Sequence, residues 1–289
     1  MKTTDTSTRF LFRDADVRGN LLNLQESYLA VVDAHDYPPV IARLLGEFLA
    51  GALLLSETIK FQGRLLLQAR TDGAIRLLMA EANDRREVRG IVRLDEDQPL
   101  PDDFEALFAG GTLAVMIEPE QGESYQSLVP LIGGSLAECL EHYFRQSEQL
   151  STLIQLTASA TGAGGFLLQQ LPAQRVTDRR RREDQWQHLS ILGASLTPAE
   201  LMSLDHQTTV ARLFARETVE IFEPARVRFA CSCNEQRLAN SLISLGSDEL
   251  TVLFAESADV VLTCEFCRTE YTFDEVSLAR LAAGEAPSH

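Results

Sequence analysis

The stretch 231–267 begins with Cys231-Ser232-Cys233, continues for thirty residues and ends with Cys264-Glu265-Phe266-Cys267. It holds four of the five cysteines of the chain, in two close pairs. A Cys-x-x-Cys turn directs two sulfur atoms at one ion, and four thiolates complete the tetrahedron that zinc takes readily. The tighter Cys-x-Cys pair is less usual as a zinc half-site, and its crowding favours oxidation of the two thiols together.

The residues alone leave three interpretations of Cys231, Cys233, Cys264 and Cys267 open. They are a structural zinc ribbon, a redox pair without metal, and a metal site that is also a switch. Residues 225–289 predict a compact α+β tail with a small core, and a domain of this size often needs a staple. Four thiolates on one zinc would supply it, so we expect removal of the metal to unfold the tail.

The composition is that of an acidic globular protein with 289 residues and a net charge of −16. Such a chain repels phosphate backbones, so we expect no nucleic-acid partner. The first residues lack the apolar segment of a secretory signal, and the longest apolar run, residues 48–55, is too short to span a bilayer. We therefore expect no membrane association and a cytoplasmic location, where thiols are kept reduced.

Residues 1–176 predict one large layered β/β/α domain. A long helix starts at Pro38-Pro39, and its apolar residues recur around much of its circumference, so we expect it to be buried between layers. Strands are predicted from alternating apolar residues at 10–12, 17–24, 65–69, 75–79, 92–94, 113–117, 153–156 and 166–171. Gly162-Ala163-Gly164-Gly165 is interpreted as a turn, because no P-loop lysine follows it.

A second helix is predicted at 135–149, with Cys139 on its apolar stripe. We interpret this fifth cysteine as a small core hydrophobe, separate from the four clustered thiols.

Residues 177–224 predict a helical linker that is poor in apolar residues. Asp178 caps a charged helix start, Arg179–Arg182, and Thr197-Pro198-Ala199-Glu200 is a capping box. The apolar stripes of these helices are thin and interrupted, so the helices must dock on another part of the protein. A docked, weakly held segment between two domains is either a moving part or a plain connector, and the sequence leaves both open.

We find no pattern that indicates catalysis. The five histidines, His35, His142, His188, His206 and His289, form no zinc-protease motif, and no nucleophile elbow or paired carboxylate signature is present. The chain is therefore predicted not to be an enzyme.

Several other stretches of the chain carry distinctive patterns. They are Asp16-Val17-Arg18-Gly19, residues 38–63 with Lys60-Phe61-Gln62-Gly63, Ser127–Leu131, Gly165–Pro172 and Phe222-Glu223-Pro224. Together with the two cysteine pairs, they make the chain similar over essentially its whole length to heat shock protein 33, the redox-regulated holdase chaperone of bacteria. The resemblance does not explain the role of the run Arg179–Arg182.

The resemblance implies a mechanism. In the reduced form, one zinc per chain is held by Cys231, Cys233, Cys264 and Cys267. Oxidation then joins Cys231 with Cys233 and Cys264 with Cys267, zinc is released, and the tail and linker unfold.

The resemblance also implies partners and domain roles. Residues 1–176 bind unfolding clients and dimerise on activation, 177–224 form a metastable linker, and 225–289 are the zinc-binding redox switch. Activity needs no ATP, and clients pass to an ATP-dependent foldase system. The alternative is a constitutive protein-interaction module in which zinc is purely structural.

Overall fold

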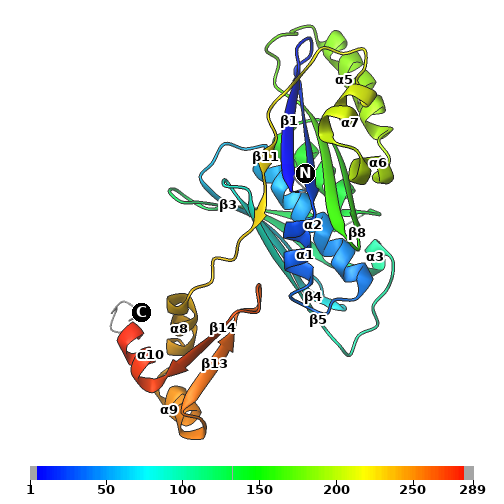
Figure 1. Cartoon of the computed structure of the whole chain (residues 1–289). Coiled ribbons are helices and arrows are strands. Elements are labelled where there is room, and N and C mark those ends of the chain that lie inside the picture. Colours follow the sequence, from blue (N-terminus) through cyan, green and yellow to red (C-terminus); the bar gives the residue numbers. More distant parts are fainter. Residues whose placement is uncertain (1–4, 132, 283–289) are drawn as a thin grey trace. The chain divides into compact units, whose positions relative to one another are not determined.

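The computed structural model describes residues 5–131 and 133–282 of the chain. These residues form two compact units, which divide between residues 229 and 230 (Figure 1). Unit 1 contains two large sheets, and unit 2 contains a two-stranded sheet. Helices and strands occur in both units, so the predicted α+β class is confirmed.

Sheet A of unit 1 is antiparallel, and its strands follow the order β10-β1-β2-β9-β8, with β11 also paired to β1. These strands are β1 (Thr6–Phe12), β2 (Val17–Leu24), β8 (Thr152–Ser159), β9 (Gly162–Gln170), β10 (Val219–Ile221) and β11 (Ala225–Arg226). Strand β1 therefore receives its outer partner from a segment about two hundred residues later in the chain.

Sheet B follows the order β12-β5-β4-β3-β6-β7. Its strands are β3 (Gly63–Arg70), β4 (Ile75–Asn83), β5 (Glu87–Leu94), β6 (Thr112–Pro119), β7 (Tyr125–Pro130) and β12 (Arg228–Phe229). All neighbours are antiparallel except β12, which runs parallel to β5. The short helix α3 (Phe104–Leu107) stands between β5 and β6 in the chain.

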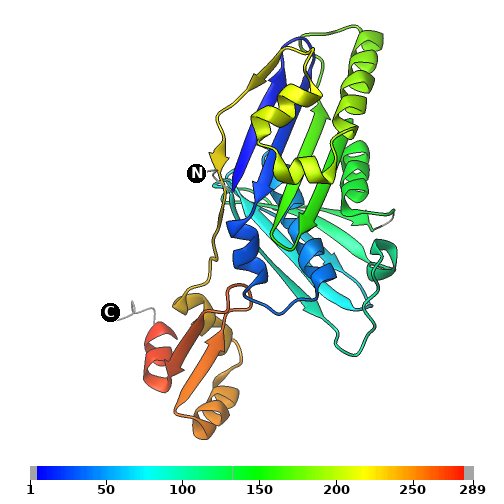
Figure 2. The ribbon, with the colours of Figure 1, turned by 45° about the vertical axis from the view of Figure 1, so that its right-hand side comes forward.

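Helix α2 (Pro39–Ser56) packs against strands of both sheets, which confirms the prediction of a buried helix (Figure 2). Phe48, Leu49 and Leu53 are fully buried in the core that the two sheets share. By length and composition α2 is apolar enough to cross a membrane, but 72% of that stretch is buried inside the protein. A core helix passes the same test, and the packing explains the apolar composition.

Three further helical segments complete this core: α1 (Glu26–Val32), α4 (Leu136–Tyr143) and the π-helical turn η1 (Phe144–Glu148). Cys139 of α4 is fully buried there, as its apolar stripe predicts.

Helix α2 ends earlier than the stretch 38–63 suggests. The hydroxyl of Ser56 donates to the carbonyl of Leu53, and that of Thr58 donates to the carbonyl of Leu55. These bonds satisfy carbonyl groups of the last turn, so the helix stops at Ser56 and β3 starts at Gly63.

The linker helices lie together on the face of sheet A that is turned away from α2 (Figures 1 and 2). They are α5 (Arg179–Ala194), α6 (Pro198–Ser203) and α7 (His206–Leu213). Their few apolar side chains form a separate core with Phe10, Phe12 and Phe166 of the sheet. The predicted caps are present at Asp178, which accepts from the Arg181 amide, and in the Thr197 capping box.

The turn predicted at residues 162–165 is wrong, because these residues form the first half of strand β9. The glycines serve close packing on both faces of the strand. A Cβ on Gly165 would lie 2.9 Å from Leu54 Cδ1 of α2, and one on Gly164 would lie 3.0 Å from Met202 Sδ of α6. Small residues therefore let one strand be sandwiched between two helices.

Unit 2 consists of α8 (Glu235–Ile243), α9 (Ser247–Glu256), β13 (Asp259–Thr263), β14 (Glu270–Asp274) and α10 (Glu275–Ala282). Its buried apolar core, among the described residues, is Ala239, Leu242, Phe273, Leu278 and Leu281. Helix α9 contributes no buried residue. A core of this size supports the expectation that the unit needs a further stabilising element.

Candidate functional site

The sulfur atoms of Cys231, Cys233, Cys264 and Cys267 come together in unit 2, all within 4.8 Å of one another. Cys231 Sγ lies 3.7 Å from Cys264 Sγ, and Cys233 Sγ lies 3.4 Å from Cys267 Sγ. Metal–sulfur bonds of about 2.3 Å in a tetrahedron give sulfur–sulfur edges of about 3.8 Å. The four residues therefore have the size and the donor set of a metal site made of thiolates.

A tight loop between β13 and β14 positions Cys264 and Cys267. The Cys264 amide donates to the Thr269 carbonyl at 2.8 Å, and the Arg268 amide donates to the Cys264 carbonyl at 2.9 Å. Arg268 takes a left-handed conformation, with φ of 59°, which turns the chain back into β14.

The segment before α8 positions the other two thiols. Asn234 caps this helix by accepting from the Arg237 amide at 2.8 Å. The Arg237 side chain in turn donates to the Ser232 carbonyl at 2.9 Å. These bonds fix the backbone on both sides of Cys233 and hold the Cys-x-Cys pair at the helix start.

The four thiols have unequal electrostatic surroundings. Burial raises the pKa of Cys231 to about 12. Burial also opposes ionisation of Cys267, but its hydrogen bonds with the Thr269 hydroxyl and amide, together with those to Cys233 and Cys264, outweigh burial and lower the pKa of Cys267 to about 7. The Tyr271 hydroxyl lies 3.3 Å from Cys233 Sγ, and this contact together with burial raises the tyrosine pKa to about 12. Cys267 is therefore more readily ionised than Cys231, and Tyr271 stays a neutral hydrogen-bonding group.

In unit 1, the buried carboxylate of Asp16 binds the backbone at the start of the linker. The Asp16 carboxylate accepts from the amides of Gln174, Arg175 and Val176 at 3.0 to 3.1 Å, and from Arg182 Nη1 at 2.9 Å. Its side chain is 6% exposed. Burial raises the pKa of Asp16, but the three amides and Arg182 outweigh burial and lower it. The carboxylate is therefore ionised at neutral pH and joins the linker to sheet A.

The four arginines of the charged run, Arg179–Arg182, therefore have different roles. Arg182 donates to Asp16 and to the Leu171 carbonyl, whereas Arg179, Arg180 and Arg181 are exposed. The first three arginines therefore face solvent at the start of α5, and the fourth docks the linker on Asp16.

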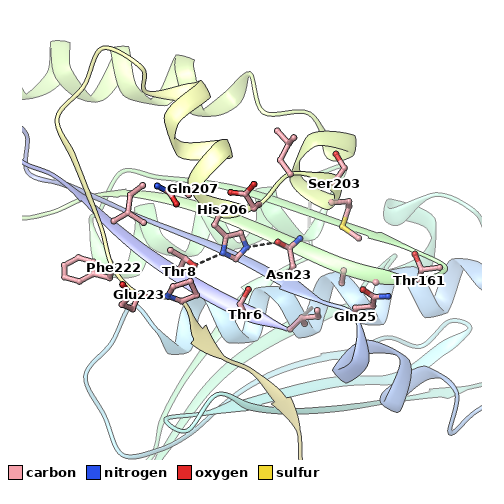
Figure 3. Close-up of a pocket in the computed structure, with 18 residues that line it drawn as sticks. Thr6, Thr8, Asn23, Gln25, Thr161, Ser203, His206, Gln207, Phe222 and Glu223 are labelled. Atoms are coloured by element: carbon pink, nitrogen blue, oxygen red, sulfur yellow. Dashed lines mark hydrogen bonds between the residues drawn. The ribbon is translucent and has the colours of Figure 1, made fainter. Parts of the chain in front are cut away.

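A buried histidine anchors the second half of the linker (Figure 3). His206 Nδ1 lies 2.7 Å from Thr8 Oγ1 of β1, and its Nε2 lies 2.6 Å from Asn23 Oδ1 of β2. Asn23 also donates to the Leu201 carbonyl of α6 at 2.9 Å. Burial lowers the pKa of His206 to about 4, against a smaller opposing effect of Asp205. The imidazole is therefore neutral at physiological pH and links two linker helices to the sheet.

Sequence reasoning did not assign roles to Asp16, Arg182, His206 or Tyr271. The Asp16 motif was visible in the sequence only as a resemblance, since its partners lie about 160 residues further along the chain. No local pattern distinguishes His206 from His188, which is exposed and contacts Glu217.

The comparison with protein families decides the identity of the chain. The family model described as "Hsp33 protein" matches residues 5–274. The chain belongs to the Hsp33 family. It is 46% identical over 286 residues to the 33 kDa chaperonin of Pseudomonas aeruginosa (strain UCBPP-PA14), which covers 98% of this chain and 96% of the relative. The 33 kDa chaperonin of Ectopseudomonas mendocina is 45% identical over 289 residues, covering 98% of each chain.

The fold is that of a solved Hsp33 structure. The crystal structure of the 33 kDa chaperonin (heat shock protein 33 homolog) of Thermotoga maritima matches with a TM-score of 0.81 at 24% identity, over 97% of this chain and 98% of that one. The predicted family and fold class are therefore confirmed.

Family membership supports a chaperone function and a role in binding unfolded proteins. The relatives are named as chaperonins, and these names state no catalysed reaction. The clustered thiols are compatible with metal binding and with redox chemistry. Six features of the chain stay predictions: the metal, the disulfide pairing, the dimer, the foldase partner, the domain roles and the cytoplasmic location.

Proposed function

We propose that this Hsp33 protein is an ATP-independent holdase that oxidation switches on, and that Cys231, Cys233, Cys264 and Cys267 hold one zinc ion in the resting state. The observation that carries this proposal is the clustering of four thiol sulfurs, all within 4.8 Å of one another, in a unit with a small apolar core. When bound, zinc supplies cross-linking of the two halves of the site and keeps the sulfurs as thiolates.

The residues of unit 2 suggest why oxidation unfolds it. A structural zinc site contributes on the order of 10 kcal/mol to a small domain, whereas a small domain has only about 5 kcal/mol or less of net stability. Oxidation of the four thiolates to two disulfides removes all four ligands. We propose that Cys231 pairs with Cys233 and Cys264 with Cys267, as in the resembling family. Such pairs close very short loops, which restrain the unfolded chain little, so they do not replace the metal.

The chemistry balances with peroxide as the oxidant. Each disulfide forms from two thiolates, which lose two electrons, while one peroxide takes up two protons and the two electrons and gives two waters. Two peroxides are consumed per chain.

The linker is the proposed second moving part. Its helices contribute few buried side chains, and its docking depends on localised contacts at Asp16 and His206. We infer that unfolding of unit 2 allows the linker 177–224 to undock and exposes apolar side chains of sheet A to clients. Dimerisation of residues 1–176, transfer of clients to an ATP-dependent foldase and a cytoplasmic location belong to the same proposal.

The decisive experiment measures zinc and holdase activity together. We expect one zinc per reduced chain, its release by peroxide with mild heat, and suppression of client aggregation in light scattering only after oxidation. Peptide mapping distinguishes the proposed disulfides from Cys231–Cys264 and Cys233–Cys267. Cys139→Ser is the matched control, because this buried thiol lies in unit 1 and should leave zinc binding intact.

An oxidised, zinc-free chain that leaves a heat-denatured client to aggregate would refute the proposal. Retention of zinc in a folded chain after the same peroxide treatment, without suppression of client aggregation, would favour the alternative of a constitutive interaction module with a structural metal.

A further inference from the structure

The outer edge of β1 is covered by a segment that we call the strap, residues 218–226. Its first half, β10, pairs with β1 in the register Phe12↔Val219 and Phe10↔Ile221. Its second half, β11, pairs Ser7 with Ala225. The strap therefore occupies the edge of sheet A along nearly the full length of β1.

The backbone bonds identify which groups of β1 face the strap. The Arg13 amide donates to the Thr218 carbonyl, and the Phe222 amide donates to the Arg9 carbonyl, both at 2.9 Å. Because backbone groups alternate in direction along an antiparallel strand, Leu11 faces the same edge as Arg9 and Arg13. Without the strap, β1 presents these groups unpaired, and such an edge is a template for another extended chain.

The strap is a poor strand by itself. Its paired parts have three and two residues, and between them it leaves β1. A cavity of about 580 Å³ opens there between β1, the strap and the linker turn 202–207 (Figure 3). The strap side chains Ile221 and Phe222 are 36% and 40% exposed. Short pairing, a hollow beneath and exposed apolar side chains describe a segment that is easily displaced.

The strap overlaps the last residues of the linker, 218–224, and is tied to the linker helices through one apolar cluster. Val219 packs on the core that the linker helices share with sheet A, beside Phe12. Phe214, at the end of α7, contacts the Phe12 ring edge-on with centroids 4.9 Å apart. Undocking of the linker therefore removes the side-chain contacts that hold the strap.

We propose that the edge of β1 is a client-binding site, and that the strap occupies it in the resting state as an internal stand-in for the client. The occupant is an extended segment of an unfolding protein with apolar residues at every second position, like Val219 and Ile221. This proposal rests on the proposed function, because release of the linker opens the edge.

The site explains how many different sequences can be accepted. Backbone hydrogen bonds along β1 do not depend on the client side chains, while Phe10 and Phe12 favour apolar residues on one face. In the resting protein the strap competes intramolecularly, at an effective concentration on the order of millimolar, so free segments are excluded.

Strand β7 provides an internal comparison, because it is the outermost strand at one side of sheet B in the part of the chain that the structure describes. Leu128 of β7 is 66% exposed. No linker segment covers this edge among the described residues, so binding there would not depend on release of the strap.

The first test uses the reduced, zinc-loaded full chain. Glu220→Pro removes an amide that faces β1 and should free the strap, whereas Glu220→Gln keeps the amide and removes only the exposed ion pair with Arg13. The probe is a fluorescently labelled peptide of strap sequence 218–226, with a second peptide carrying proline at the position of Glu220. We expect anisotropy to show binding of the first peptide to the proline variant at least about tenfold tighter than to the glutamine variant, and weak binding of the second peptide.

Equal binding to both variants, or equal binding of both peptides to a Glu220→Pro chain that retains its zinc and circular dichroism, overturns the proposal. This test does not use oxidation, so it separates failure of the strap from failure of the redox switch.

The second test needs no destabilised variant. A photo-crosslinking amino acid replaces exposed Arg9 of β1 or, as the control, exposed Gln126 of β7, and each oxidised protein is irradiated with an unfolded client. We expect client adducts from position 9 after oxidation and none from the reduced protein. Adducts only from position 126, or only with a second copy of the chain, overturn the proposal. An oxidised chain that suppresses aggregation without adducts at position 9 refutes the edge site and leaves the holdase function intact.

Discussion

Replacement of Asp16 by asparagine is expected to undock the start of the linker in the reduced protein. The carboxylate accepts from three consecutive amides, those of Gln174, Arg175 and Val176, and from Arg182. An asparagine of the same shape loses the charge, and its amide nitrogen cannot accept a hydrogen bond. All four donors bond to Oδ2, so an asparagine oxygen in that place keeps them within reach, but it carries no charge. The Arg175 amide then loses its second acceptor at Oδ1, and the Arg182 guanidinium, whose side chain is 16% exposed, loses its carboxylate partner.

The expected cost follows from these contacts. A hydrogen bond to a charged group contributes about 1.5–3 kcal/mol. Removing one partner of a buried ion pair costs about 3–5 kcal/mol. We therefore expect about 3–5 kcal/mol, which raises the undocked population between about 100-fold and about 5,000-fold. The lowered pKa of Asp16 means that its contribution is present above its unfolded pKa and is lost as the pH falls through the folded value. The full effect of the substitution is therefore present at neutral pH.

Hydrogen exchange with mass spectrometry measures this effect directly. Peptides from α5 should exchange faster in Asp16→Asn, by the same factor, while peptides from α2 should not change. Asp14→Asn is the matched control, because Asp14 is exposed and its carboxylate has no hydrogen bond among the described residues. Unchanged protection of α5 in Asp16→Asn, or equal loss in both variants, would refute the reasoning that this carboxylate holds the linker.

Three further outcomes are expected. Because the pKa of His206 is lowered to about 4, the docked linker loses stability as the pH falls from about 6.5 towards 4, by about 2 kcal/mol at pH 5. Hydrogen exchange of α7 should become faster over the same pH range. His206→Gln should abolish this pH dependence. Gly165→Ala should lower the free energy of unfolding of unit 1 by about 1–3 kcal/mol in denaturant titration, because its Cβ would meet Leu54 at 2.9 Å; an unchanged midpoint would contradict the packing described for β9. Tyr271→Phe removes the hydroxyl beside Cys233 and should weaken zinc binding about tenfold in a chelator competition, whereas equal affinity would show that this hydrogen bond is dispensable.

Much of unit 2 could be predicted from local patterns. The two cysteine pairs lie close in sequence to caps and turns that position them, such as Asn234 before α8. In unit 1, the wide apolar surface of α2 likewise showed that this helix must lie between layers.

The prediction at Gly162–Gly165 was wrong for a tertiary reason. Glycine weakens a strand when considered alone, so a local reading favours a turn. In the fold, α2 and α6 approach the strand from opposite faces, and only residues without side chains leave room for both.

Residue identity, spacing and periodicity over short stretches of chain were enough to indicate the family, the α+β class and the four thiols. The packing of distant elements was needed to show that Asp16 accepts from amides about 160 residues away and that the strap covers β1. Contacts of this kind arise from the packing of elements that are distant in sequence. No local pattern encodes them, because each partner makes chemical sense only once the other is beside it.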